Sequence, residues 1–207
     1  MHARSTTIQA TSSAIEAGLR YMRDDALRTL TDIDGFTGIS ALVDRESGRC
    51  IVTTAWRSEE AMRASANEVG PIRDRAVREF GAGAPEVEEW EIAVLHRDHA
   101  AGDGAWCRVA WVRADPANAD RAVDSFRMIA LPEIEQSEGF CSASMMINRG
   151  SGLAVSSVAF ESLEAMRAAR ERADEVRARV TSQAGAEVLE VREFELALAH
   201  LRVPELA

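Results

Sequence analysis

The chain has 207 residues, of which 46% are hydrophobic and 28% are charged, a composition typical of a soluble globular protein. Its net charge is −10 at pH 7, with the acidic residues spread along the chain. This argues against nucleic acid and anionic membranes as partners, because both require a basic surface. No apolar run is long enough for a membrane span or a secretion signal, so we expect a cytoplasmic protein.

Periodic patterns in the first half of the chain predict six secondary-structure elements. Ser58, followed by two glutamates, is suited to cap a helix, and Gly48 is suited to a hairpin turn. The predicted elements are a strand over about residues 5–10, a helix from Thr11 or Ser12 to about 33, strands over about 35–44 and 50–56, a helix from Ser58 towards 80, and a strand over 87–95.

The second half predicts the same order of elements. Asp115 and Pro116 form a helix cap followed by proline at the first helical position. Ser162 occupies the place of Ser58, and the hairpin turn falls at 149–152. The flanking strands are expected over about 106–114 and 188–199.

The two halves are copies of one another at a constant separation of 104 residues. Gly35-Phe36 returns as Gly139-Phe140, and the sequence of residues 60–64 returns at 164–168. About 28 of roughly 93 aligned positions are identical. We therefore expect a first domain at residues 1–97, a flexible linker at 98–104 and a second domain at 105–207.

The βαββαβ order of each half predicts a ferredoxin-like α+β fold, with two helices on one face of a four-stranded antiparallel sheet. Strand segments such as 39–43 and 155–159 lack a clean polar side, so the second face of each sheet also needs cover. We expect the two repeats to form an intramolecular, pseudo-dimeric α+β barrel. Such a chain could be a monomer or a dimer of such chains.

Three features of each half resemble the antibiotic biosynthesis monooxygenase (ABM) domain of the dimeric α+β barrel superfamily. They are a Gly-Phe pair entering the second strand, a Ser-Gly hairpin, and an aromatic residue that ends the third strand before a Ser-capped helix. The last feature is carried by residues 56–62 and 160–166. The resemblance covers about residues 5–200. It implies the barrel fold, but its functional implications are broad, because one fold hosts many activities.

The resemblance also implies a ligand cleft between helices and sheet. Cofactor-free members oxidise polycyclic phenols in an apolar pocket with a few polar groups, so a small aromatic ligand is expected. The alternative is that the same residues only pack the core. The cleft candidates are aromatic and methionine side chains at matched positions: Met22, Phe36, Trp56, Met62, Phe126, Phe140, Phe160 and Met166.

The haem-degrading branch of the superfamily requires a histidine in the helix after the third strand, and neither half has one there. His96 and His200 end the last strands; each is either a general base or a solvent-facing residue. No His, Cys or Asp spacing indicates a metal site, so we expect neither metal nor cofactor. Three cysteines without framework spacing indicate free thiols in a reducing compartment.

Paired carboxylates occur at Glu89 and Glu193, and at Glu91 and Glu195. They could act as acid and base, or they could meet arginines or water. The arginine retained at positions 63 and 167 either closes such pairs, binds an acidic ligand or is solvated.

The halves differ most clearly at two places. Gly70-Pro71 is expected to break the second helix of the first half, because proline removes a helical hydrogen bond, while positions 174 and 175 keep its counterpart continuous. The second half is also richer in aromatic and sulfur-containing residues: Trp106, Trp111, Phe126, Phe140, Met145 and Met146. These are the places at which chemistry is expected.

No combination of side chains identifies a catalytic residue. The resemblance implies a cofactor-independent monooxygenase acting on an aromatic or polyketide-type small molecule. The lack of a matched constellation of His, Tyr or Asn residues favours a non-catalytic ligand-binding or structural barrel. The sequence leaves both functions open.

Overall fold

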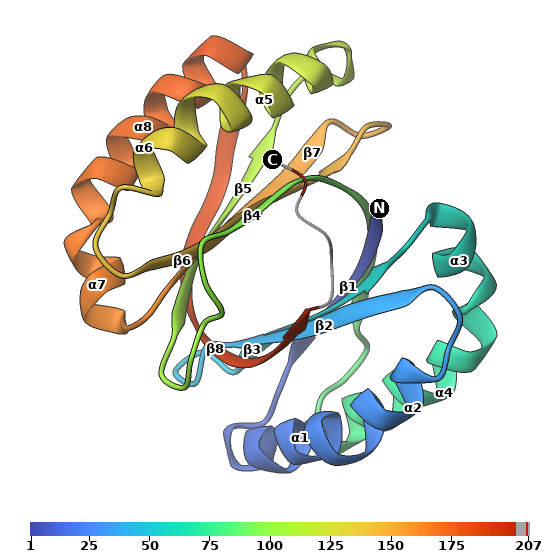
Figure 1. Ribbon diagram of the computed structural model, residues 1–207. Coiled ribbons are helices and arrows are strands. Elements are labelled where there is room, and N and C mark those ends of the chain that lie inside the picture. The colour runs from blue at the N-terminus through green and yellow to red at the C-terminus, as the bar shows by residue number, and fades with distance from the viewer. Residues whose placement is uncertain (202–205, 207) are drawn as a thin grey trace. The chain divides into compact units, whose positions relative to one another are not determined.

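The computed structural model describes residues 1–201 and Leu206, and these form two compact units (Figure 1). Among the described residues, the first unit contains 1–90 and 196–201, and the second contains 91–195 and Leu206. The last strand of each repeat is long, and the unit changes partway along it, after Trp90 and after Glu195. The compact units therefore differ from the sequence repeats by the ends of these two strands.

The first repeat contains the six predicted elements, with its helices divided into shorter segments. These are β1 (His2–Gln9), a 3-10 turn (Ser12–Ala14), α1 (Ile15–Tyr21), a π-helical segment (Met22–Ala26), α2 (Leu27–Thr31), β2 (Phe36–Val43), β3 (Arg49–Trp56), α3 (Glu59–Ala64), α4 (Ala66–Glu79) and β4 (Glu86–Arg97).

The second repeat follows the same order. Its elements are β5 (Trp106–Arg113), a 3-10 turn (Pro116–Asn118), α5 (Ala119–Ser125), a π-helical segment (Phe126–Ala130), α6 (Leu131–Ile134), β6 (Phe140–Asn148), β7 (Leu153–Phe160), α7 (Leu163–Ala168), α8 (Arg170–Ala184) and β8 (Glu187–Leu201).

All the strand pairs with a described register are antiparallel. In the first unit β3 lies between β1 and β2, and in the second unit β7 lies between β5 and β6. The strand order is β1-β3-β2-β8-β5-β7-β6-β4, a closed barrel. The predicted α+β fold of two ferredoxin-like repeats in one barrel is confirmed.

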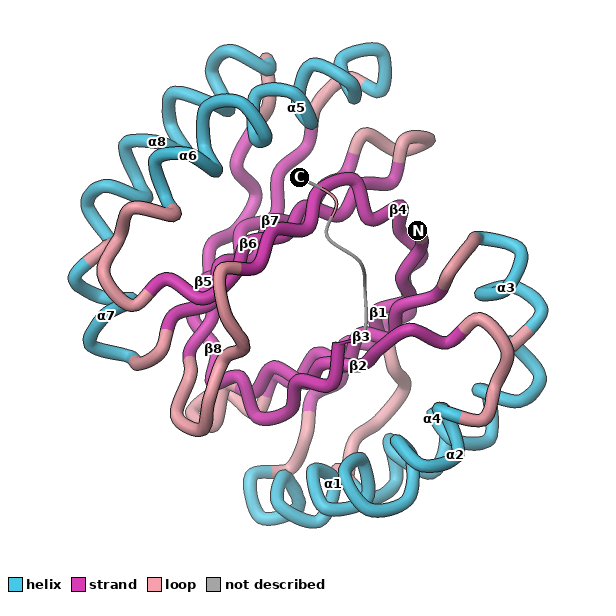
Figure 2. The backbone as a smooth tube through the Cα atoms, viewed as in Figure 1, coloured by secondary structure: helices cyan, strands magenta, loops and turns pink. Residues whose placement is uncertain are grey.

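The helices of each unit cover one face of its strands and enclose a hydrophobic core (Figure 2). In the first unit this core includes Leu19, Trp56 and Phe80, all at most 1% exposed. In the second it includes Phe126, Ile147 and Val176. Burial of such side chains contributes roughly 1.5–3 kcal/mol each, so each unit has a stabilising core of its own.

Local sequence signals place several element boundaries as predicted. The Ser58 and Ser162 hydroxyls each accept a hydrogen bond from a backbone N–H three residues later, at 3.1 Å. Asp115 caps the 3-10 turn at 116–118, where its carboxylate accepts from Ala117 N–H, two residues later, at 2.9 Å. Gly139 has a φ of +73°, and a Cβ there would lie 2.7 Å from Ala165 Cβ. The Gly-Phe motif is therefore a steric requirement of the helix that passes over it.

The expected helix break at Gly70-Pro71 is wrong. The helix α4 runs through Pro71, and the interruption lies six residues earlier at Ser65, with its counterpart at Ala169 in the second repeat. Because the helix restarts at Ala66, Pro71 removes only one hydrogen bond near its beginning. The preceding Gly70 has no Cβ, so the usual clash between that atom and the proline ring does not arise here.

Candidate functional site

The second unit contains a cavity of about 80 Å³ between its helices and its sheet. The strands β5, β6 and β7 supply one wall, including Arg108, Ala110, Met145 and Ser156. The opposite wall comes from α5, the π-helical segment, α6 and α8. Helices and strands of the second unit therefore enclose the site. Figure 1 shows these helices lying over one face of the strands.

The strand register brings the cavity's polar side chains next to one another. Ala110 of β5 is paired with Ser156 of β7, which is paired in turn with Met145 of β6. Arg108 is paired with Val158, so it lies two residues from Ala110 on the same face. The sheet wall thus combines one guanidinium and one hydroxyl with apolar side chains.

The helical wall is almost entirely apolar. Phe126 and Ala130 come from the π-helical segment, and Val176 and Val180 come from α8. Single π-helical turns commonly occur at functional sites, because they change the direction of side chains within a helix. Arg177 of α8 also lines the cavity but donates a 2.7 Å hydrogen bond to Asp174.

The first unit has a smaller cavity of about 40 Å³ at the matching place. Its lining includes Arg4, the counterpart of Arg108, and Phe80, whose counterpart is Ala184. The Phe80 ring fills space that stays open beside Ala184, and Phe80 itself is fully buried. The larger cavity therefore lies in the repeat that lacks this aromatic side chain.

A second difference between the repeats, Gly18 against Ala122, is linked to the exchange of Phe80 for Ala184. A Cβ on Gly18 would lie 2.4 Å from the Phe80 ring, so glycine is required wherever that ring is present. The counterpart of Gly18 is Ala122, which lines the second cavity together with Ala184. The two repeats thus use two matched pairs of residues, one that fills the cavity and one that leaves it open.

Arg108 is the most deeply buried charged residue of this site, with 6% of its surface exposed. Its Nη2 donates to the backbone carbonyl of Met166 at 3.2 Å and to Oε1 of Glu193 at 2.9 Å. Its Nη1 is buried and has no hydrogen-bond partner among residues 1–201 and Leu206. Leaving a buried charged donor unpaired costs about 1–3 kcal/mol or more.

Glu193 is shared between two arginines. Arg170 donates to the same Oε1 at 2.7 Å from the exposed start of α8. Burial acts to raise the pKa of Glu193, but the hydrogen bonds from Arg170 and Arg108 outweigh it, and the pKa is lowered. Glu193 is therefore ionised at neutral pH, and one carboxylate faces two guanidinium groups.

The first unit builds the matching pair differently. Arg4 donates to Glu89 through both Nε and Nη2, at 3.1 and 2.7 Å, and to the Met62 carbonyl at 3.1 Å. The position that matches Arg170 is Ala66. Two nitrogens of Arg4 thus donate to one oxygen of Glu89, Oε1, whereas Arg108 uses one nitrogen for its carboxylate.

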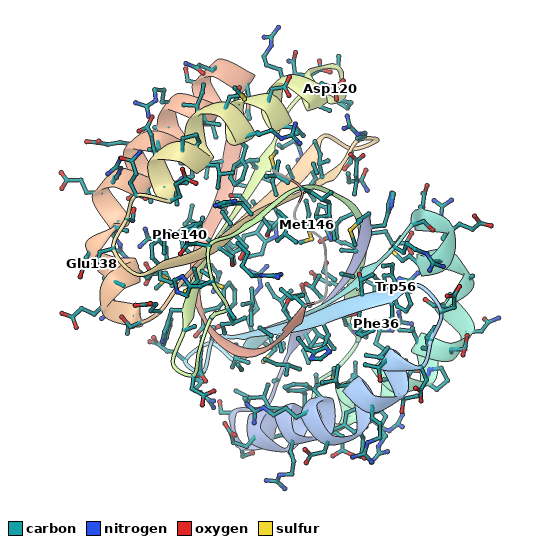
Figure 3. The ribbon with its side chains drawn as sticks, viewed as in Figure 1. Phe36, Trp56, Asp120, Glu138, Phe140 and Met146 are labelled. Carbon is teal, nitrogen blue, oxygen red and sulfur yellow. The ribbon has the colours of Figure 1, made fainter. Side chains whose placement is uncertain are left out.

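Two of the eight predicted cleft residues, Met22 and Phe126, line the two cavities. The rings of Phe36 and Trp56 pack edge to face with their centroids 5.6 Å apart (Figure 3). Trp56 Nε1 donates to the Thr54 hydroxyl. Six of the eight predicted cleft residues are absent from the described lining of both cavities: Phe36, Trp56, Met62, Phe140, Phe160 and Met166. The five of this group other than Phe36 are at most 4% exposed. The structure therefore places the eight in hydrophobic clusters rather than around one cavity: six lie in the two cores, and Phe160 and Met166 lie in a third, smaller cluster.

Three of the four paired carboxylates, Glu89, Glu91 and Glu193, meet arginines, as the second of the two sequence interpretations expected. Glu91 binds Arg149 at 2.6 Å, alongside the Glu89 and Glu193 pairs. The retained Arg63 pairs with Glu59 at 2.6 Å, and its distance to Glu89 is longer, at 4.0 Å. The main partner of Glu89 is therefore Arg4, which sequence patterns did not single out.

The histidines lie away from the second cavity's lining. His96 Nε2 is 3.3 Å from Glu135, and its ring stacks on Phe140, so a carboxylate that sequence patterns did not reveal orients it. His200 Nε2 is buried and lacks a hydrogen-bond partner among the described residues. Across residues 1–201 and Leu206, no three His, Cys, Asp or Glu side chains cluster as metal ligands would. The same residues include no helix that could cross a membrane.

Arg108 is the site residue that sequence analysis missed. An arginine between Cys107 and Val109 has the spacing of an outward-facing position, and its acidic partner is 85 residues away. A usable signal was nevertheless present, because Arg4 and Glu89 recur as Arg108 and Glu193 at the repeat separation. A charge retained inside two copies of one strand indicates a buried partner.

No protein-family model matches the chain. The chain is 51% identical over 207 residues to the uncharacterized protein Rv2558 of Mycobacterium tuberculosis strain H37Rv, covering 100% of this chain and 87% of that one. A candidate monooxygenase from Lactobacillus acidophilus has a TM-score of 0.71 at 13% identity, over 97% and 96% of the two chains. An anthrone oxidase-like protein has a TM-score of 0.65 at 14% identity, over 100% and 95%. These likenesses confirm the ABM-type barrel fold.

Proposed function

Because the chain belongs to the same family as Rv2558 of Mycobacterium tuberculosis and has the ABM-type fold, we propose that it is an ABM-like protein acting on a small aromatic molecule. The second unit binds this molecule between helices and sheet and oxygenates it without a cofactor. The observation that carries the proposal is the cavity of about 80 Å³ where Ala184 replaces Phe80. Apolar cavities with a few convergent polar groups are the usual sites of small ligands.

The size of the cavity limits the ligand. It is about half of the roughly 150 Å³ that binds benzene in an engineered apolar cavity. A single ring therefore enters only if lining side chains move outward, and a three-ring anthrone requires a larger opening. Arg177 and Thr181 of α8 are only half-buried, so the ligand would enter past this helix.

The proposed reaction balances with molecular oxygen alone. A phenol loses its O–H hydrogen and one ring C–H hydrogen and becomes a quinone. One atom of O₂ becomes the new carbonyl oxygen, and the other leaves with both hydrogens as water. The substrate supplies all four electrons, and the phenolate is the electron-rich form that reacts. The role of the protein is to exclude water and to hold the ring.

A second candidate is a ligand-binding protein without catalysis. It is favoured by the composition of the cavity, whose described lining includes no His, Asp, Glu, Cys or Tyr. General-base catalysis requires such a group within hydrogen-bond reach of the proton that is removed. Oxygenation at this site therefore depends on a substrate that arrives deprotonated or loses its proton to water.

Oxygen consumption with phenols, naphthols and anthrones tests the proposal. We expect uptake by the natural chain and its loss in the double variant Ala122→Gly/Ala184→Phe, which transfers the Gly18–Phe80 pair to the second unit. Ala122→Gly alone is the matched control, because it alters the same helix and leaves the cavity open. Binding without oxygen uptake would support the second candidate. Undiminished uptake by the double variant would exclude this cavity as the site.

A further inference from the structure

We propose that Arg108 binds a negatively charged oxygen of the ligand, so that the second cavity selects small organic acids, phenolates or carboxylates, over neutral molecules of the same shape. The inference rests on the proposed binding cavity and names the chemical class of its ligand. Its basis is a guanidinium that is 6% exposed, lines a mostly apolar cavity and has one nitrogen without a partner among the described residues.

The unpaired nitrogen gives the first argument. Nη2 of Arg108 is occupied by the Met166 carbonyl and by Glu193, whereas Nη1 has no partner among the described residues. Buried charged donors are normally satisfied, because an unmade hydrogen bond retains the full desolvation cost. A ligand oxygen beside Nη1 would supply the missing acceptor.

The local charge gives the second argument. Arg108 and Arg170 both donate to Oε1 of Glu193, so two positive groups share one negative group. Arg170 adds a positive charge to an otherwise neutral pair. The other carboxylate near Arg170, Asp174, is itself bound by Arg177 at 2.7 Å, so positive groups outnumber negative ones here. An anion that reaches Arg108 therefore meets an attractive potential inside a weakly polarisable cavity, where such attraction is stronger than in water.

The first unit provides an internal comparison. Two nitrogens of Arg4 donate to Glu89, and Ala66 occupies the position of Arg170. Phe80 reduces the cavity of this unit to about 40 Å³. The second unit therefore has more space beside its arginine, and two arginines donate to Oε1 of its carboxylate. This is the pattern expected if one repeat kept a ligand site and the other became scaffold.

Charge selectivity can be measured on the full chain by isothermal titration calorimetry. Acetate and benzoate are compared with acetamide and benzamide, which have the same shape without the charge. We expect each acid to bind about ten- to a hundredfold more tightly than its amide, the range typical of a hydrogen bond to a charged group. For phenolates, absorbance of 4-nitrophenol should show a larger ionised fraction when it is bound.

Substitutions test the contribution of Arg108 to ligand selectivity separately from that of the other cavity residues. Arg108→Met should abolish the preference for acids and change amide affinity by no more than about twofold, whereas the matched Arg4→Met should keep the preference. If Arg108→Met does not fold, Arg170→Ala takes its place in the test. Arg170 is exposed, so its substitution should leave the fold intact. It should weaken benzoate binding and spare benzamide.

The outcomes distinguish this inference from the proposed function. Equal binding of acids and amides, or selectivity that survives in both Arg108→Met and Arg170→Ala, would overturn the role of Arg108 and leave the cavity as a binding site. Absence of binding by any probe, or unchanged binding in Ala122→Gly/Ala184→Phe, would overturn both. Tighter binding of 4-nitrophenolate than of benzoate would assign the natural ligand to the phenolates.

Discussion

Arg108 and Glu193 lie 2.9 Å apart in the second unit, as Arg4 and Glu89 lie 2.7 Å apart in the first. Both pairs join the first strand of a repeat to its last strand, and both arginines also donate to a backbone carbonyl at the end of a short helix. The pair is therefore part of the duplicated scaffold. What distinguishes the second copy is the additional arginine and the open space beside it.

Glu193→Gln should lower stability at neutral pH by about 2–3 kcal/mol, because Arg108 loses its charged acceptor. The folded-state pKa of Glu193 is lowered, so its stabilising contribution is present above its ordinary pKa of 4.5 and is lost as the pH falls below it. The variant should therefore lose less stability on acidification than the natural chain. Urea denaturation between pH 3 and 7 measures both effects. A variant with the same acid dependence as the natural chain would contradict this prediction.

Gly18 and Phe80 should be energetically coupled. Gly18→Ala places a Cβ 2.4 Å from the Phe80 ring and should destabilise the fold by about 1–3 kcal/mol through overpacking. Phe80→Ala should cost about 3–5 kcal/mol. In the double variant, Gly18→Ala should no longer be destabilising, because alanine occupies space that the ring has left. A double-mutant cycle by chemical denaturation measures the coupling, and additive effects would refute it.

Features decided by neighbouring residues were predictable from the sequence. The Ser58 and Ser162 caps, the Gly-Phe entry to the second strand and the order of elements all follow from local patterns and their repetition. The break at Pro71 was predicted wrongly, because the interruption at Ser65 starts a new helix and places the proline near its beginning. The intrinsic effect of proline is real, but its position within the helix decides the cost.

The candidate site was harder to predict, because it depends on a side chain that the second half lacks. The second half has more aromatic residues, but this pattern does not indicate which half contains a cavity. The larger cavity of the second half arises from an aromatic side chain that it lacks, at Ala184. Comparison of the repeats position by position shows this exchange, but only the structure shows that position 184 faces the same space as Arg108. Packing between distant segments cannot be read from the pattern of either one.

The three cysteine thiols should be unreactive in the folded protein. All three are buried and free, and burial raises the pKa of Cys50 and Cys141 to about 11 and that of Cys107 to about 12. Because the thiolate is the reactive form, little of it exists at neutral pH. A thiol-specific chromogenic reagent should detect none in the native chain and all three in denaturant. Rapid labelling of one cysteine in the native state would contradict its burial.

His99 should titrate above the ordinary histidine pKa of 6.5. Its ring contacts Asp98 at 2.8 Å and Glu161 at 3.2 Å, and the hydrogen bond with Asp98 is the main cause of the raised pKa. A raised folded-state pKa means that protonated His99 stabilises the folded chain below pH 6.5, and this contribution is lost as the pH rises through the folded pKa. Titration of the imidazole C–H signals by NMR measures the midpoint. Asp98→Asn should move it down towards 6.5, and Glu161→Gln should move it less. An unchanged midpoint in Asp98→Asn would show that the pair does not hold the proton in solution.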